Sequence, residues 1–166
     1  MKRRRGFTLV ELLIVIAVMG VLSSMMMVSS SESVSTAKAN NIISSLRNFS
    51  MAAMAYYTDN VETFGANPNK DIDFATVKKY MHNEGNIPDV DSYTVTNNSG
   101  VWWAGYNLTN ENTSVKQKLS NRADSANLKG AGNTPPTTTP YPKYDSSSSG
   151  HTHVWLLIRS NQRPSE

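Results

Sequence analysis

Apolar residues are concentrated at the start of this chain. The segment from Phe7 to Val28 is 22 residues long and carries one charged residue, Glu11. About 20 apolar residues are enough for a helix to cross a bilayer. A Ser-rich stretch follows, and beyond it apolar residues recur at the three- and four-residue spacings of an amphipathic helix: Ala37, Ile42, Ile43, Leu46, Phe49, Ala53, Met54 and Tyr57. The pattern predicts one helix from about Phe7 to about Asp59, apolar in its first half and amphipathic over residues 29–60.

Residues 61–166 have the mixed pattern of a small globular head. Apolar positions in 71–82 predict a short helix, with Asp71 or Asp73 as its N-cap. A second helix is predicted for residues 113–128, where a sparse apolar side recurs at helical spacing. No proline occurs before Pro68, so no proline interrupts the long helix that precedes the head.

The remaining segments of the head read as strands and one long loop. Residues 93–96 alternate, residues 97–100 have the composition of a tight turn, and residues 101–108 are rich in aromatic residues. This order is typical of a β-hairpin. Residues 130–150 are rich in Pro, Ser and Thr, which predicts a loop that buries little. Residues 151–159 regain strand character and are expected to join the hairpin in a small antiparallel sheet.

The first residues of the chain carry a recognisable motif. A basic block, Lys2 to Arg5, is followed by Gly6 and Phe7, and Glu11 is the fifth residue counted from Phe7. This segment resembles the processing site of type IV pilins and of the pseudopilins of type II secretion systems. The resemblance implies that a prepilin peptidase cuts between Gly6 and Phe7 and that Phe7 is then N-methylated. Residues 1–6 would be the leader peptide and residues 7–28 the transmembrane and assembly half of the helix.

With this resemblance, the expected fold class is α+β and pilin-like. One long N-terminal helix, a membrane spine followed by an amphipathic half, would pack on a small antiparallel β-sheet with extra short helices. Three other interpretations of the N-terminus remain: a secretory signal peptide, a twin-arginine signal and a plain signal anchor. No Ala-x-Ala-like site follows the apolar run, which ends in Ser and Met residues. Glu11 has no purpose inside a signal-peptide core, so the prepilin interpretation is favoured.

Glu11 is the residue to which we assign assembly. An acid inside a membrane segment is costly, and a buried carboxylate needs a partner or a proton. Cleavage after Gly6 would create a partner, the α-amino group of Phe7. The resemblance implies that Glu11 of an incoming subunit, unmatched in lipid, pairs with the N-terminus of a subunit already in the filament.

Overall charge does not indicate a nucleic-acid partner. The formal charge of +3 depends on the leader, because four of the 16 basic residues are Lys2 to Arg5 and 12 remain against 13 acidic residues. The chain has no cysteine, so no disulfide stabilises the head. Neither a cofactor nor a metal is expected, and no motif of an enzyme stands out.

The head contains two weak candidates for chemistry. His151 and His153 alternate and would share one side of a strand, but no third metal ligand accompanies them. Asp89 and Asp91 lie in a predicted turn with oxygen ligands that suit calcium, although no complete ligand set is identifiable.

The adjacent pair Trp102 and Trp103 should face opposite sides of a strand. One would be in the core, and the other is a candidate for an exposed interface or a glycan-binding face.

The sequence therefore predicts a structural prepilin subunit rather than an enzyme. It would polymerise into a type IV pilus or a type II secretion pseudopilus. Its partners would be other subunits, the prepilin peptidase, an inner-membrane platform protein and an assembly ATPase. Before assembly it would cross the inner membrane once, with a cytoplasmic N-terminus and an external head. The alternative is a membrane-anchored binding module for glycan or DNA uptake that forms no filament.

Overall fold

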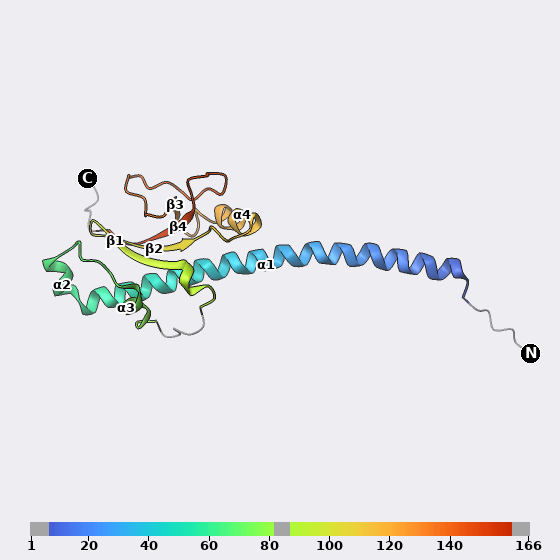
Figure 1. Cartoon of the computed structure of the whole chain (residues 1–166), viewed down its shortest axis with the longest axis horizontal. Helices are drawn as coiled ribbons and strands as arrows, with labels where there is room; N and C mark the ends of the chain where they lie inside the picture. The colour runs from blue at the N-terminus through green and yellow to red at the C-terminus, as the bar shows by residue number, and fades with distance from the viewer. Residues whose placement is uncertain (1–6, 82–86, 161–166) are drawn as a thin grey trace, which may run out of the picture.

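A computed structural model describes residues 7–81 and 87–160 of the chain, without the side chains of residues 27–30. Its dominant element is the helix α1, Leu9–Asp59, which is 51 residues long. At 1.5 Å per residue this helix is about 77 Å in length. Figure 1 shows that its first half projects alone, while the head packs against its second half. The prediction of one continuous N-terminal helix is confirmed.

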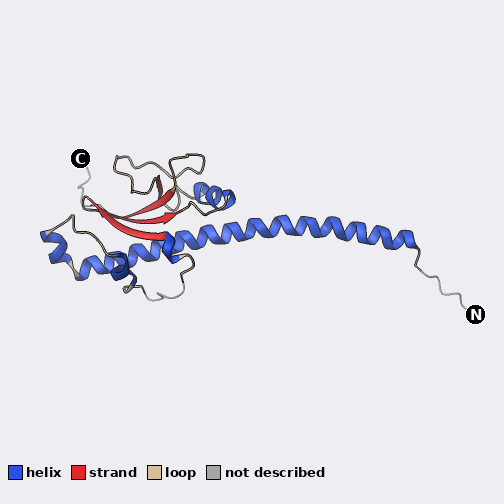
Figure 2. Ribbon diagram, viewed as in Figure 1, coloured by secondary structure: helices blue, strands red, loops and turns tan. Residues whose placement is uncertain are grey.

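The head combines short helices with one sheet, as Figure 2 shows. Its elements, in chain order, are α2 (Val61–Ala66), α3 (Phe74–Lys78), the 3-10 turn η2 (Val90–Ser92), β1 (Tyr93–Asn98), β2 (Val101–Asn107), α4 (Thr113–Asn121), β3 (Leu128–Ala131) and β4 (His153–Arg159). The strands lie in the order β1-β2-β4-β3, and each neighbouring pair is antiparallel. The predicted α+β class is therefore confirmed.

The β1–β2 hairpin has a two-residue turn. Ser99 and Gly100 both have positive φ, 55° and 82°, which is the backbone of a type I′ turn that suits the twist of two antiparallel strands. The Asn97 side chain accepts a hydrogen bond from the Gly100 amide at 3.0 Å. The predicted hairpin is confirmed, with β1 extending two residues further than the predicted strand.

One face of the sheet packs on the amphipathic half of α1. Strands β2 and β4 supply buried residues to this face, and α1 supplies the residues opposite them: Ala39, Ile42, Leu46, Phe49 and Ala53 from the helix, and Trp102, Ala104, Tyr106, Val154 and Leu156 from the sheet. The Trp102 ring meets Phe64 of α2 at 4.8 Å between centroids, edge to face. The apolar side of the amphipathic half of α1 thus forms one side of the core.

The opposite face of the sheet is covered by the loop that follows β3. Trp103 and Trp155 form a second apolar cluster there, against which Tyr141 packs. Tyr141 meets Trp103 edge to face at 4.8 Å, and the Trp155 Nε1 group donates a hydrogen bond to the Gly132 carbonyl at 3.3 Å. Within the same loop, Tyr144 is only 1% exposed. The prediction that residues 130–150 bury little is therefore wrong, because this loop shields a sheet face that would otherwise expose two tryptophans.

Two helix predictions need correction, and one helix was not predicted. The helix predicted for 113–128 ends at Asn121, and Leu128 begins β3. Asn127 has φ 55°, a left-handed conformation that no α-helix continues through. The helix predicted for 71–82 is shorter, Phe74–Lys78, and Asp73 rather than Asp71 caps it by accepting from the Ala75 amide; residue 82 is outside the described residues. The short helix α2 was not predicted.

Candidate functional site

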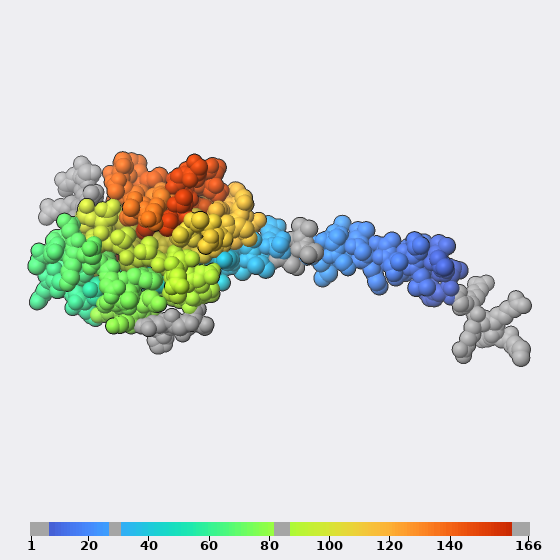
Figure 3. Space-filling view, viewed as in Figure 1, coloured from blue at the N-terminus to red at the C-terminus, as the bar shows by residue number. Residues whose placement is uncertain are grey.

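The N-terminal half of α1 has no packing partner within the chain. Every described side chain from Phe7 to Met26 is exposed, including Leu9 at 78%. Figure 3 shows this segment extending away from the head. By length and composition α1 can cross a membrane. Because the segment is apolar on all sides, it requires an apolar environment that the head does not provide.

Glu11 and Thr8 form a capping box at the start of α1. The Thr8 amide and the Thr8 hydroxyl each donate to Glu11 Oε2 at 2.8 Å, and the Glu11 amide donates to Thr8 Oγ1 at 3.3 Å. This reciprocal arrangement satisfies backbone donors that have no partner in the first helical turn. Within its own chain the Glu11 carboxylate therefore accepts two hydrogen bonds, both from uncharged donors of Thr8. Its pairing with the N-terminus of another subunit stays a prediction.

Thr8 is the functional residue that the sequence analysis missed. Its signal was present, because Thr8-Leu9-Val10-Glu11 fits the capping-box pattern of Ser or Thr followed three residues later by Glu. Phe7 immediately precedes the cap and is 79% exposed, whereas Gly6 lies outside the described residues. Cutting the bond before Phe7 would leave the Thr8 amide intact, because that amide belongs to the next peptide bond. The cap is thus compatible with processing.

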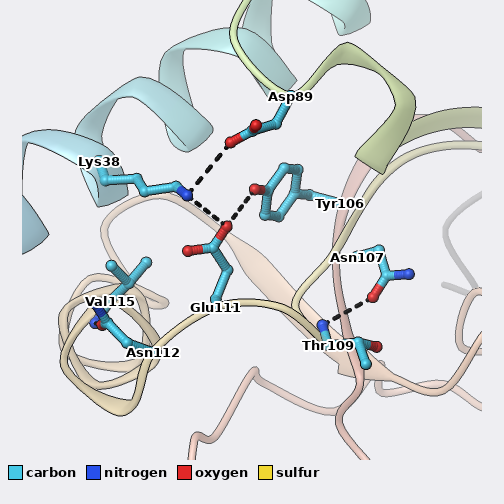
Figure 4. A network of polar contacts seen from close by, with 8 residues as sticks. All are labelled: Lys38, Asp89, Tyr106, Asn107, Thr109, Glu111, Asn112 and Val115. Carbon is cyan, nitrogen blue, oxygen red and sulfur yellow. Dashed lines mark hydrogen bonds and ion pairs between the residues drawn. The ribbon is translucent and has the colours of Figure 1, made fainter.

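A second cluster of polar groups fastens the head to α1 (Figure 4). The Lys38 Nζ atom of α1 lies 2.9 Å from Glu111 Oε1 and 3.3 Å from Asp89 Oδ2. The Tyr106 hydroxyl donates to the same Glu111 oxygen at 2.6 Å. Asp89 precedes β1 and Glu111 follows β2, so Lys38 ties both ends of the hairpin to the long helix.

The members of this cluster differ in their exposure to water. The Glu111 side chain is 6% exposed, whereas those of Lys38 and Asp89 are 41% and 52% exposed. The hydrogen bond between Lys38 and Glu111 is the main cause of the raised pKa of Lys38, and Asp89 raises this pKa further. Burial and the neighbouring Glu111 carboxylate raise the pKa of Tyr106. No local sequence spacing reveals this cluster, because its residues come from separate segments that only the fold brings together.

The histidines do not form a shared metal site. His151 Nδ1 accepts a hydrogen bond from the Asp145 amide at 3.1 Å, while His153 stacks on Trp155 at 5.7 Å. Burial lowers the pKa of His153. Within residues 7–81 and 87–160, no group of three potential ligands converges. Asp89, the weak candidate for a calcium ligand, pairs with Lys38.

The tryptophans do not form an exposed binding face. Trp102 and Trp103 do face opposite sides of β2, as predicted, but each is 1% exposed. Trp155 is equally buried. The expectation that one of the adjacent pair is open to an interface or a glycan is wrong, because the loop after β3 covers Trp103.

Comparison with protein families agrees with the motif at the N-terminus. Residues 1–27 match the family model of the prokaryotic N-terminal methylation motif. No curated protein and no solved structure was found to match the chain. The chain therefore carries a class III signal of the kind found in type IV pilins and pseudopilins. This signal supports a type IV pilin-like prepilin subunit and points to a structural protein rather than an enzyme.

Proposed function

We propose that this chain is a prepilin that is cut between Gly6 and Phe7, methylated at Phe7 and assembled into a helical filament. The filament is a type IV pilus or a type II secretion pseudopilus. The observation that carries the proposal is the methylation motif at residues 1–27, continuous with a helix whose described side chains up to Met26 are all exposed.

The physical argument concerns the fate of this apolar helix half. Burying apolar surface stabilises a folded or assembled state by about 25 cal/mol per Å². An exposed apolar segment of this length therefore does not persist in water. Only two environments suit a helix that is apolar on all sides: the interior of a bilayer and a bundle of similar helices. A filament subunit uses the first before assembly and the second after it.

Glu11 makes that transfer directional. Within one chain, its carboxylate accepts hydrogen bonds from Thr8 and has no charged partner among the described residues. In a helix bundle it would also pair with the methylated α-amino group of Phe7 on a neighbouring copy, a charge-assisted contact that is stronger than a neutral hydrogen bond. The additional pairing favours the bundle over the isolated helix and fixes the axial register of the incoming copy.

The membrane orientation follows from the basic leader. Lys2 to Arg5 precede the apolar half, and basic residues next to a membrane helix stay on the cytoplasmic side. The head is then outside the inner membrane before assembly. A prepilin peptidase, a platform protein and an assembly ATPase are the partners that such a subunit requires.

Intact-mass and N-terminal analysis of the chain expressed with a prepilin peptidase tests the processing step. A product that begins at methylated Phe7 is expected. A product that keeps Met1, or one cut near Ser29, would contradict the proposal.

Assembly is tested separately, in cells that supply the assembly machinery. Glu11→Leu should insert and be processed normally but should not yield filaments, with Leu12→Ala as a matched control that keeps the acid. Filaments formed by Glu11→Leu at the wild-type level would refute the assigned role of Glu11. A processed wild-type chain that stays single in the membrane would instead favour the alternative, an anchored binding module.

A further inference from the structure

The exposed side of α1 beside the head is almost free of charge. Between Ser33 and Thr58, the exposed positions contain one charged residue, Arg47, among small, amide and Met residues: Ser33, Val34, Ala37, Asn40, Asn41, Ser44, Arg47, Asn48, Met51, Met54, Ala55 and Thr58. A helix surface that faces only water normally carries many charged residues. Within the part of the chain that the structure describes, Arg47 forms no ion pair.

The other flank of the same helix has an excess of negative charge. Lys38 is flanked there by Asp89 and Glu111, so the three groups sum to one negative charge when all are ionised. Of the two carboxylates Asp89 is the exposed one, and only its Oδ2 atom is engaged by Lys38. A cavity of about 360 Å³ lies beside the cluster, lined in part by Val34 and Pro88. A cation that approached from outside would meet Asp89 first.

Arg47 and Lys38 are on opposite flanks of α1. Nine residues separate them, which corresponds to about half a turn around the helix and about 14 Å along its axis. Arg47 and the acidic cluster are therefore complementary surfaces that face away from each other within one chain. Two complementary surfaces on opposite sides of a molecule join copies head to tail, and such contacts build open helical arrays.

We infer that the head half of α1 binds a second copy of this chain, with the Arg47 guanidinium of one copy against the Asp89 carboxylate of the next. The inference rests on the proposed filament and specifies a contact within it. The partner is a second copy because both complementary groups belong to this chain, and because the face that carries Arg47 lies on the same helix as the apolar half that the filament would bury. Copies joined in this way are staggered by roughly 14 Å along the helix axis.

The chain offers a clean test because it contains no cysteine. Arg47→Cys and Asp89→Cys are made on separate, differently tagged copies that are expressed together with the peptidase and the assembly machinery. Sheared filaments are treated with a short bifunctional thiol reagent, because the Cα atoms of an arginine–aspartate pair lie further apart than a disulfide spans. We expect a crosslinked dimer that contains one copy of each tag. The matched control combines Arg47→Cys with Asp124→Cys, whose native side chain is 80% exposed, and should give no such dimer.

Charge variants supply a second readout. Arg47→Glu should lower filament yield about two- to five-fold or more, because an exposed ion pair is weak but its reversal adds repulsion at every contact. Arg47→Lys should restore most of the yield. Asp89→Asn should lower it as well while keeping the left-handed backbone at φ 56°, which asparagine tolerates.

The outcomes separate this contact from the filament itself. Wild-type chains that form no filaments would refute both the proposed function and the contact. Filaments without the 47–89 crosslink, or with a crosslink between two copies at position 47, would overturn the contact and leave the filament proposal intact. Equal yields from Arg47→Glu and wild type would overturn the contact as well.

Discussion

Replacing Glu111 by alanine should destabilise the head more than any other change in the ion cluster. Its side chain is 6% exposed and accepts from the Tyr106 hydroxyl at 2.6 Å while it pairs with Lys38 at 2.9 Å. A hydrogen bond to a charged group contributes about 1.5–3 kcal/mol, and an ion pair with a half-exposed lysine adds about 0.2–1 kcal/mol. We therefore expect Glu111→Ala to lower the free energy of unfolding by about 2–4 kcal/mol.

Urea unfolding of the full chain in detergent, followed by tryptophan fluorescence, measures this change. All three tryptophans are 1% exposed, so their emission reports the head. Asp89→Asn is the control. Because the Asp89 side chain is 52% exposed, this substitution should lower the free energy of unfolding by no more than about 1 kcal/mol. Equal losses for Glu111→Ala and Asp89→Asn would refute the reasoning that burial sets the size of the effect.

A double-mutant cycle separates the hydrogen bond from the rest of the loss. Glu111→Ala leaves the Tyr106 hydroxyl without its acceptor in a buried position, whereas Tyr106→Phe removes that unsatisfied group. The double variant should therefore lose less stability than the sum of the single variants, with a coupling of about 1–2 kcal/mol. Strict additivity would show that the 2.6 Å contact contributes nothing to stability.

Three further predictions concern other parts of the chain. Gly105→Ala should lower the free energy of unfolding by about 1–3 kcal/mol in a thermal unfolding experiment, because the new Cβ would overlap the buried Trp155 ring. An unchanged unfolding midpoint would contradict this packing. Burial raises the pKa of Tyr144 to about 12, so the unfolded chain loses the Tyr144 proton at a lower pH than the folded chain. The free energy of unfolding should therefore fall as the pH rises from about 10 towards 12. Tyr144→Phe should make this part of the pH profile less steep. Thr8→Val should weaken the first turn of α1 by about 1 kcal/mol, measured as faster hydrogen exchange of the Glu11 amide, whereas Thr8→Ser should exchange like the wild type.

Local signals were strong enough to predict the long helix and the hairpin. The apolar positions of α1 recur at helical spacing over many turns, and an uninterrupted segment of that length is rarely anything but a helix. The hairpin prediction depended on the turn composition of residues 97–100, in which Gly100 adopts a positive φ without steric cost. The capping box was equally local, and Thr8 was missed only because Glu11 was interpreted as a membrane charge.

The strand β3 could not be predicted in the same way. Leu128–Ala131 is four residues long, and nothing in it distinguishes a strand from the end of the preceding helix. Its conformation is determined by pairing with β4, which lies more than twenty residues later in the chain. The loop between them was interpreted from its prolines as an open segment, yet it folds back over Trp103.

The methylation motif and the apolar helix could be recognised from the amino-acid sequence, because each follows from composition and period within a short window. The α+β class followed from the order of such windows along the chain. Which polar residues meet depends on the fold. Lys38, Asp89, Glu111 and Tyr106 come from separate segments, and only the packing of the sheet on α1 brings them within hydrogen-bonding distance. The fold also decided that all three tryptophans are covered, since burial depends on which segment closes over each face and not on the residue that is covered.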